Sequence, residues 1–307
     1  MSMSTSLAQV ATRFPSVSRG ILSLSVSGYV PPIHRHWFFN SLAGQLFDEV
    51  GFPMWGSPYK LHIPRELRPI YLGYFHFLDH EPLTRRVFAN LLRPGSAVID
   101  VGANIGYYTL LAAARVGVKG KVHSVECSRE TLAILKENVR RNNLKNVTIY
   151  PVAAAKERGE LRLNVSAIGL SLLPLHENWP KVSGSGTTVT VPAVPLDELI
   201  SSPVHVVKID AEGADLEVLQ GMKRILSENQ SISVIVEWAP PLLAEAGKDP
   251  LELPRWLREA GFTKITVLDE TTNKRTSVDA VVDQVRAGNL PPRWVGDLFA
   301  QRASNPV

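Results

Sequence analysis

The sequence has little cysteine and no long apolar run. Cys127 is the only cysteine among the 307 residues, which excludes an internal disulfide and a cysteine metal cluster. We therefore expect a reducing compartment, with the cytoplasm as the default location. The best early apolar stretch, residues 20–30, is interrupted by serines and falls short of the roughly 20 apolar residues that span a bilayer. We expect no membrane span.

The sequence also lacks dense charge of one sign. Its 33 basic and 29 acidic residues are interspersed, so no basic block indicates a nucleic-acid partner. The small excess fits a weakly anionic or a neutral ligand. The eight histidines show no HExxH or comparable spacing, so we expect no transition-metal site.

Acidic residues are absent before Asp48, in a leader that is rich in serine and dotted with arginine. This composition fits a transit peptide or an unstructured arm, and we interpret residues 1–55 as an arm. Residues 56–95 contain clustered aromatics and histidines, and we interpret them as a lid or flanking region. The main domain is expected over residues 96–307.

From Ser96 onward, short β-branched runs alternate with segments of helical period, which predicts βαβ units and a doubly wound, mostly parallel sheet. An excursion from the sheet is expected between residues 160 and 194, and a loop at 284–293. The expected strands are 97–101, 121–126, 147–150, 204–210, 232–237, 265–268 and a last, antiparallel one at 296–301. The expected helices are 107–116, 128–142, 215–226 and 251–260.

The first strand runs into a turn with the spacing G-x-x-x-G, formed by Gly102 and Gly106. We expect the backbone N–H groups of this turn to face a ligand and its glycines to let that ligand approach. The middle glycine that brings a dinucleotide's pyrophosphate close is missing. Glu126 ends the next strand, where a carboxylate can accept hydrogen bonds from both ribose hydroxyls of an adenosine. Adenosine without pyrophosphate indicates S-adenosylmethionine, although a bare turn with a helix-start charge is the alternative.

Further carboxylates follow the strands at the same rim of the predicted sheet. Asp100 either caps the turn or orients the amino group of the cofactor's methionine, and we favour the second role. Asp210 and Glu212 follow the fourth strand, although Glu212 could instead serve the next helix as an N-terminal charge. Lys208, inside an apolar strand, must either pair with one of these carboxylates or point into the ligand cavity.

These motifs resemble the FkbM family of methyltransferases. The first family motif matches residues 98–108, and the more distinctive K-I-D-x-E-G-A-[ED] string matches residues 208–215. The resemblance covers roughly residues 74–301. Further matches are Glu81-Pro82, Arg93-Pro94-Gly95, Leu196-Asp197-Glu198-Leu199, Glu237 and Gly296-Asp297-Leu298-Phe299-Ala300.

The resemblance implies a Rossmann-like class I methyltransferase fold of seven strands, the last antiparallel, with helices on both faces. It also implies O-methylation of a hydroxyl on a sugar, glycan or secondary metabolite. Two departures stand out. The usual aromatic-Glu-Pro of the second strand is Val125-Glu126-Cys127 here, and residues 1–55 have no counterpart.

The candidate site has three parts. Candidates for cofactor binding are Asp100, Gly102, Ala103, Asn104, Gly106, Tyr107, Glu126, Cys127, Ala153 and Asp210. Candidates for the general base are Asp210, Glu212 and, behind them, His80. Candidates for the acceptor pocket are Glu81, Lys208, Glu237 and Trp238, the last with a core aromatic as an equal alternative.

Two other functions compete with a methyltransferase. A nicotinamide-dependent dehydrogenase should show G-x-G-x-x-G and a catalytic Tyr/Lys pair or His, and neither pattern is evident. A non-catalytic sensor should have lost its rim carboxylates, which are retained here. The expected partner is a small-molecule or carbohydrate acceptor, and the sequence is compatible with a homo-oligomer as well as a monomer.

Overall fold

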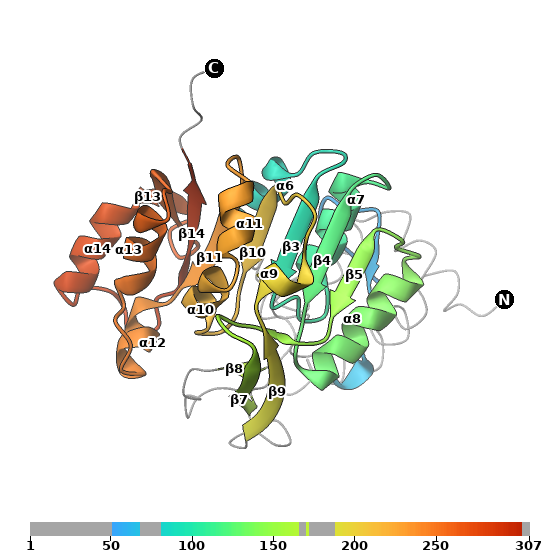
Figure 1. Cartoon of the computed structure of the whole chain (residues 1–307), viewed down its shortest axis with the longest axis horizontal. Helices are drawn as coiled ribbons and strands as arrows, with labels where there is room; N and C mark the ends of the chain where they lie inside the picture. Colours follow the sequence, from blue (N-terminus) through green and yellow to red (C-terminus); the bar gives the residue numbers. More distant parts are fainter. Residues whose placement is uncertain (1–50, 68–80, 166–169, 172–187, 303–307) are drawn as a thin grey trace, which may run out of the picture.

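The computed structural model describes residues 51–67, 81–165, 170–171 and 188–302 (Figure 1). Most of the predicted arm and His80 lie outside these residues. Within them, no helix has the length and apolar character needed to cross a membrane.

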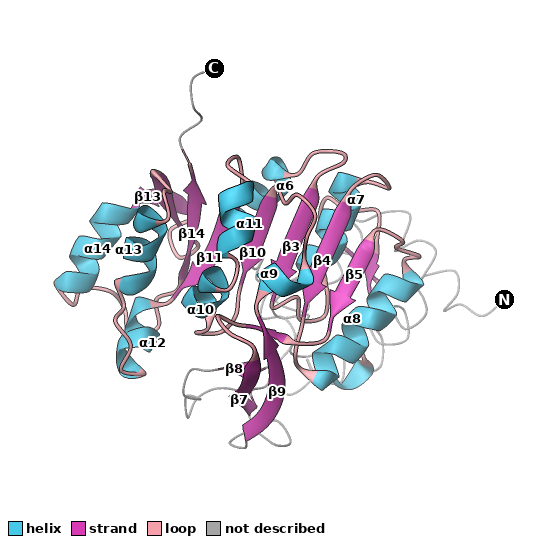
Figure 2. Cartoon of the chain, viewed as in Figure 1, coloured by secondary structure: helices cyan, strands magenta, loops and turns pink. Residues whose placement is uncertain are grey.

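An eight-stranded sheet forms the centre of the molecule, in the order β13-β12-β14-β11-β10-β3-β4-β5 (Figure 2). Strands β3, β4, β5, β10 and β11 pair in parallel, whereas β14 is antiparallel to both β11 and β12. This confirms the Rossmann-like fold with an antiparallel last strand, to which β13 adds an edge strand. The bounds are β3 (Ala97–Val101), β4 (Lys121–Val125), β5 (Val147–Tyr150), β10 (Val206–Ile209), β11 (Ser233–Trp238), β12 (Lys264–Asp269), β13 (Lys274–Ser277) and β14 (Gly296–Gln301).

Helices cover both faces of this sheet and divide the core in two. Val98 packs among side chains of helices α6, α7 and α8, whereas its neighbour Ile99 packs on the opposite face, as the two-residue period of a strand requires. Because both faces are covered, β3 is buried at every position. The helices are α6 (Pro82–Leu91), α7 (Tyr107–Val116), α8 (Arg129–Arg141), α9 (Leu196–Leu199), α10 (Asp215–Gln220), α11 (Lys223–Glu228), α12 (Pro240–Glu245), α13 (Glu252–Glu259) and α14 (Val278–Arg286).

The helix expected over residues 215–226 is instead two helices, α10 and α11, separated at Gly221. A Cβ on Gly221 would lie 1.9 Å from the backbone oxygen of Ala155, so the main chains meet there and only glycine fits. The loop expected at 284–293 begins later than predicted, because α14 extends to Arg286.

The expected excursion forms a separate four-stranded sheet in the order β6-β9-β7-β8, which projects from the main body in Figure 1. Its strands are β6 (Ala153–Ala154), β7 (Gly159–Val165), β8 (Leu170–Ser171) and β9 (Thr188–Val194). Because β6 follows β5 directly, this excursion leaves the main sheet beside the rim where the site lies.

Ahead of the main sheet, β1 (Phe52–Pro53) and β2 (Lys60–Leu61) pair antiparallel and a short 3-10 helix follows at Arg65–Leu67. Strand β1 thus lies within the segment, residues 1–55, that was interpreted as an arm. Within the region interpreted as a lid, α6 buries Val87 and Phe88 in the main core, so it covers the sheet as the other helices do.

Candidate active site

A cavity of about 400 Å³ opens at the carboxyl ends of the parallel strands. This is the edge where open α/β sheets bind ligands. Most of the predicted site residues line it, namely Glu81, Asp100, Gly102, Ala103, Asn104, Tyr107, Glu126, Cys127, Ala153, Lys208, Asp210, Glu212 and Glu237. Gly106 and Trp238 do not line it.

The backbone N–H groups of the turn after β3 donate hydrogen bonds to other groups of the protein. Those of Gly102 and Ala103 both donate to the Val125 oxygen, at 3.0 and 3.1 Å. The N–H of Asn104 donates to Glu126 Oε2 at 2.7 Å, and that of Ile105 to Asn104 Oδ1 at 2.8 Å. The expectation that these groups face a ligand is therefore wrong. Sequence spacing identified the turn, but three of these four amides have partners at the end of the neighbouring strand β4, and the fourth has its partner within the turn.

The two glycines of the turn are required by the protein itself. Gly102 has a φ of +72°, and a Cβ there would lie 1.8 Å from the backbone oxygen of Asp210. Gly106 has a φ of +100°, and a Cβ there would lie 2.8 Å from a methyl group of Leu135. Both conformations are ones that glycine adopts without strain. At Gly102, the residue after β3 thus lies against Asp210, the residue after β10.

Glu126 is buried and holds the turn with both carboxylate oxygens. Besides its bond from Asn104, it accepts the N–H of Ser128 through Oε1 at 2.7 Å. Burial raises the pKa of this carboxyl, and these backbone bonds oppose the rise. At 7% exposure Glu126 does not fit the alternative of a solvated helix-start charge. Glu126 also lines the cavity.

Asp100 lies under the same turn, 2% exposed. Its Oδ2 accepts the hydroxyl of Thr109, from α7, at 2.6 Å, and burial raises its pKa to about 6. Its side chain is therefore tied to a helix, and the residue also lines the cavity.

Lys208 and Asp210 form an ion pair with an N–O distance of 3.0 Å. Lys208 is only 2% exposed, and its Nζ lies 4.6 Å from the centre of the Tyr108 ring. Burial alone would lower the pKa of this lysine, but nearby carboxylates, Asp210 foremost, raise it well above its usual value. Both sequence alternatives hold, because Lys208 pairs with a carboxylate and also lines the cavity.

Glu212 stands in the turn after β10 with a φ of +50°. Burial, with Asp210 and Asp215 next in importance, raises its pKa to about 8. The alternative of a helix-start charge falls to Asp215, which accepts the N–H groups of Ala211 and Gly213 at 2.9 and 3.1 Å. Glu212 itself lines the cavity.

Acidic residues from strands β11 and β14 also line the cavity. Glu237 and Asp297 are directly opposite in the register of these strands. Burial, followed by Asp210, raises the pKa of Glu237 well above its usual range. Asp297 accepts the Thr84 hydroxyl at 2.6 Å, and burial followed by Glu81 raises its pKa to about 7.

Asp297, Tyr108 and Glu270 line the cavity but were not among the predicted site residues. Tyr108 donates to Glu81 Oε2 at 2.6 Å, and Glu270 accepts the N–H of Thr84 at the start of α6 at 2.7 Å. An aspartate directly before the apolar run Leu298-Phe299-Ala300 is a signal that could have identified Asp297. Glu270 comes from the loop after β12, and nothing in its sequence context indicates the site.

Trp238 is a core residue, and its assignment to the acceptor pocket is wrong. It is fully buried, its Nε1 donates to the Pro250 oxygen at 2.8 Å, and its ring packs edge-on against Trp294. Successive residues of a strand point to opposite faces, so Glu237 and Trp238 cannot both face the cavity in the same way.

The family model described as the Methyltransferase FkbM domain matches residues 100–264. A hexuronic acid methyltransferase from Haloferax volcanii is 34% identical over 177 residues, which cover 55% of this chain and 65% of that protein. A protein-L-isoaspartate O-methyltransferase from Methanothrix thermoacetophila is 29% identical over 125 residues, covering 38% of this chain and 60% of that protein. The chain thus matches less than two thirds of the length of either relative.

Among solved structures, the FkbM methyltransferase from Methylobacillus flagellatus is similar, with 16% identity and a TM-score of 0.43. The similarity covers 70% of this chain and 50% of that one.

The cavity fits S-adenosylmethionine in the groups that it offers. Buried carboxylates at the ends of β3 and β4 suit an adenosine ribose and an ammonium group, while the occupied amides of the turn leave no cradle for a diphosphate. The family match spans more than half of the chain and includes residues 100–108 of the first motif and all of the second. This chain belongs to the FkbM methyltransferase family.

Proposed function

We propose that this chain is an enzyme that transfers a methyl group from S-adenosylmethionine to a hydroxyl of a sugar, glycan or secondary metabolite. One observation carries the proposal: Asp210 stands at the cavity with its backbone against the cofactor turn at Gly102. A carboxylate in that place is within reach of both the methyl donor and an acceptor. An alcohol is a poor nucleophile, so a carboxylate that accepts its proton is what O-methylation requires.

Cofactor binding falls to the β3 and β4 side of the cavity. Glu126 would accept the ribose hydroxyls, and Asp100 would hold the amino group of the methionine portion. Tyr107, Cys127 and Ala153 would line the adenosine. When bound, the cofactor supplies a sulfonium-activated methyl group for in-line displacement, and the main contribution of the protein is to hold the acceptor oxygen opposite it.

Asp210 is the general base in this proposal. Its side chain lines the cavity and pairs with Lys208 at 3.0 Å, and a carboxylate so placed can accept a proton from a hydroxyl. Glu212, with a pKa of about 8, keeps its proton at neutral pH and is suited to donate a hydrogen bond to the acceptor. In this arrangement the two neighbouring carboxyl groups act in opposite ways.

The charged side chains around Lys208 restrict which class of acceptor can bind. Among the described lining residues, Lys208 is the only cationic side chain, and it is already paired. Six acidic side chains surround it, namely Glu81, Asp210, Glu212, Glu237, Glu270 and Asp297. The hexuronic acid methyltransferase relative supports a sugar acceptor. We infer that the sugar unit beside the reacting hydroxyl here carries no acid group of its own, because Lys208 is already paired with Asp210 and leaves a further carboxylate in this cavity without a compensating charge.

The test uses the purified full chain with isotopically labelled S-adenosylmethionine. Methylated products from a host small-molecule extract are identified by mass spectrometry, and methyl hexosides are compared with hexuronides of the same configuration. We expect label on a hydroxyl oxygen and at least about tenfold faster turnover of the neutral sugar. Label on nitrogen or protein would contradict the proposed function. Preferred turnover of the hexuronide would contradict only the inference about charge.

A further inference from the structure

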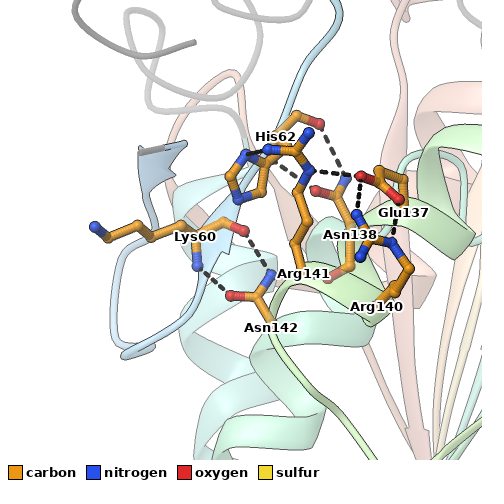
Figure 3. A network of polar contacts seen from close by, with 7 residues as sticks. All are labelled: Lys60, His62, Glu137, Asn138, Arg140, Arg141 and Asn142. Carbon is orange, nitrogen blue, oxygen red and sulfur yellow. Dashed lines mark hydrogen bonds and ion pairs between the residues drawn. The ribbon is translucent and has the colours of Figure 1, made fainter. Parts of the chain in front are cut away.

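Asn138 of α8 and Asn142, the residue that caps the C-terminus of this helix, hold the N-terminal strand β2 (Figure 3). Asn142 accepts the N–H of Lys60 at 2.8 Å and donates to its oxygen at 2.7 Å. Asn138 accepts the N–H of His62 at 2.6 Å and donates to its oxygen at 3.1 Å. Each side-chain amide thus pairs with the strand as a neighbouring strand would, and the i, i+4 spacing of the helix matches alternate residues of β2 and its extension.

Asn138 reaches one element further than Asn142. Its Nδ2 also donates to the backbone oxygen of Ile105, at 2.8 Å, in the turn after β3. Both amide hydrogens of this fully buried residue are therefore engaged, one with the N-terminal strand and one with the cofactor turn. The remaining bond of Asn142 returns to its own helix, at the oxygen of Asn138.

Ile105 lies at the centre of the turn that carries the cofactor groups. Its N–H donates to Asn104 Oδ1, and the N–H of Asn104 donates to Glu126. Leu135 of α8 packs against Gly106 on the other side. A shift of the Ile105 carbonyl would therefore move the backbone that orients Glu126.

The strand is anchored beside this contact by burial. Leu61 and Ile63 are buried in the core that also contains Ile105. Burial and the nearby charge of Arg141 lower the pKa of His62 to about 4, so its imidazole is neutral at neutral pH. Glu137 holds Arg141 in place at 2.6 Å (Figure 3).

We propose that Asn138 is a positioning residue for cofactor binding and that it couples the docked segment at residues 60–62 to the cofactor turn. When the bonds to His62 are lost, the side-chain amide of Asn138 can rotate away from the Ile105 oxygen. In the other direction, bound cofactor that fixes the turn after β3 holds this amide in the orientation that binds His62. Such coupling is reciprocal by linkage. It does not depend on which acceptor the enzyme uses.

Asn138→Ala and Asn142→Ala form a matched pair, because each removes two bonds to the strand but only the first removes the bond to Ile105. We expect Asn138→Ala to weaken S-adenosylhomocysteine binding at least about tenfold by calorimetry, and Asn142→Ala to change it less than about twofold. Asn138→Asp, which keeps the acceptor for His62 but loses the donor to Ile105, should resemble Asn138→Ala. Equal affinities for all three variants would overturn the proposal.

Hydrogen exchange of the unaltered full chain tests the coupling even if the Asn138 variants do not fold. Saturating S-adenosylhomocysteine should slow exchange of the His62 amide at least about threefold, because that amide donates to Asn138. Strand β13, at the opposite edge of the sheet from β5, is the internal control and should not respond. Unchanged exchange at residues 60–63 would refute the coupling.

Discussion

The two sides of the cavity are constructed differently. On the β3 and β4 side, the backbone N–H groups of residues 102–105 all have protein partners, and Glu126 ties the turn together. On the β10, β11 and β14 side, acidic side chains crowd around Lys208, and the pKa values of Glu212 and Asp297 are raised to about 8 and 7. The first side is suited to hold a constant ligand rigidly. The second keeps groups whose protonation can change, as proton transfer requires.

The largest effect is expected on turnover, from a substitution on the β10, β11 and β14 side of the cavity. Asp210→Asn keeps the shape of the side chain but removes its basicity, and we expect turnover to fall by about a hundredfold or more. Glu212→Gln should cost less, because Glu212 is already protonated at neutral pH. Cofactor affinity should change little in either variant, and the exposed Asp283→Asn serves as control. Unchanged turnover and pH dependence in both variants would place the base elsewhere, with His80 the next residue to test.

The second prediction concerns the cofactor side. Glu126→Ala should weaken S-adenosylhomocysteine binding by about 1.5–3 kcal/mol, measured by calorimetry, because it removes charge-assisted hydrogen bonds to the ribose. Its melting temperature should also fall, since the N–H groups of Asn104 and Ser128 lose their acceptor. The protein should still fold. If the variant binds cofactor as tightly as the parent, the ribose is held by another group.

The third prediction uses pH to examine the acceptor side. Glu212 and Asp297 keep their protons in the folded protein up to about pH 8 and 7, whereas the unfolded chain releases them near their ordinary values. The folded state therefore binds more protons across this interval, and stability falls as pH rises. His62, with a lowered pKa, acts oppositely, but only below its ordinary value of 6.5.

We accordingly expect the melting temperature of the ligand-free protein to fall by a few degrees between pH 6.5 and 8. Glu212→Gln, which cannot ionise, should flatten that decrease. Scanning calorimetry of both proteins measures it. A melting temperature that rises over this interval, or an equal slope in the variant, would show that Glu212 is ionised in the folded state.

The smallest effect is expected from the arm. Removal of residues 1–50 should leave cofactor affinity within about twofold and the melting temperature within about 2 °C, because the leader lacks a periodic apolar pattern. Calorimetry of the shortened protein tests both values. Loss of its thermal transition would make the leader part of the core or of a contact between copies.

Local pattern was sufficient for much of the fold. The β-branched runs gave strands 97–101 and 147–150 with their observed bounds, and Ser128 caps α8 by accepting the N–H of Thr131. Helix α14 was missed although its signal is present, since Ser277 caps it and Val278, Val281 and Val282 follow at helical spacing. Gly221 offered no comparable signal, because its requirement comes from a backbone oxygen 66 positions earlier, at Ala155.

The sequence by itself determined the strand-turn-helix unit, the carboxylates that end its strands and hence the family, because strand ends and short motifs are local properties of the chain. Only the tertiary structure decided which groups those residues meet. It turned the amides of residues 102–105 inward, placed Trp238 in the core and set Asp297 opposite Glu237. These outcomes depend on the order and register of strands far apart in the sequence, and register decides which face of a sheet each side chain occupies.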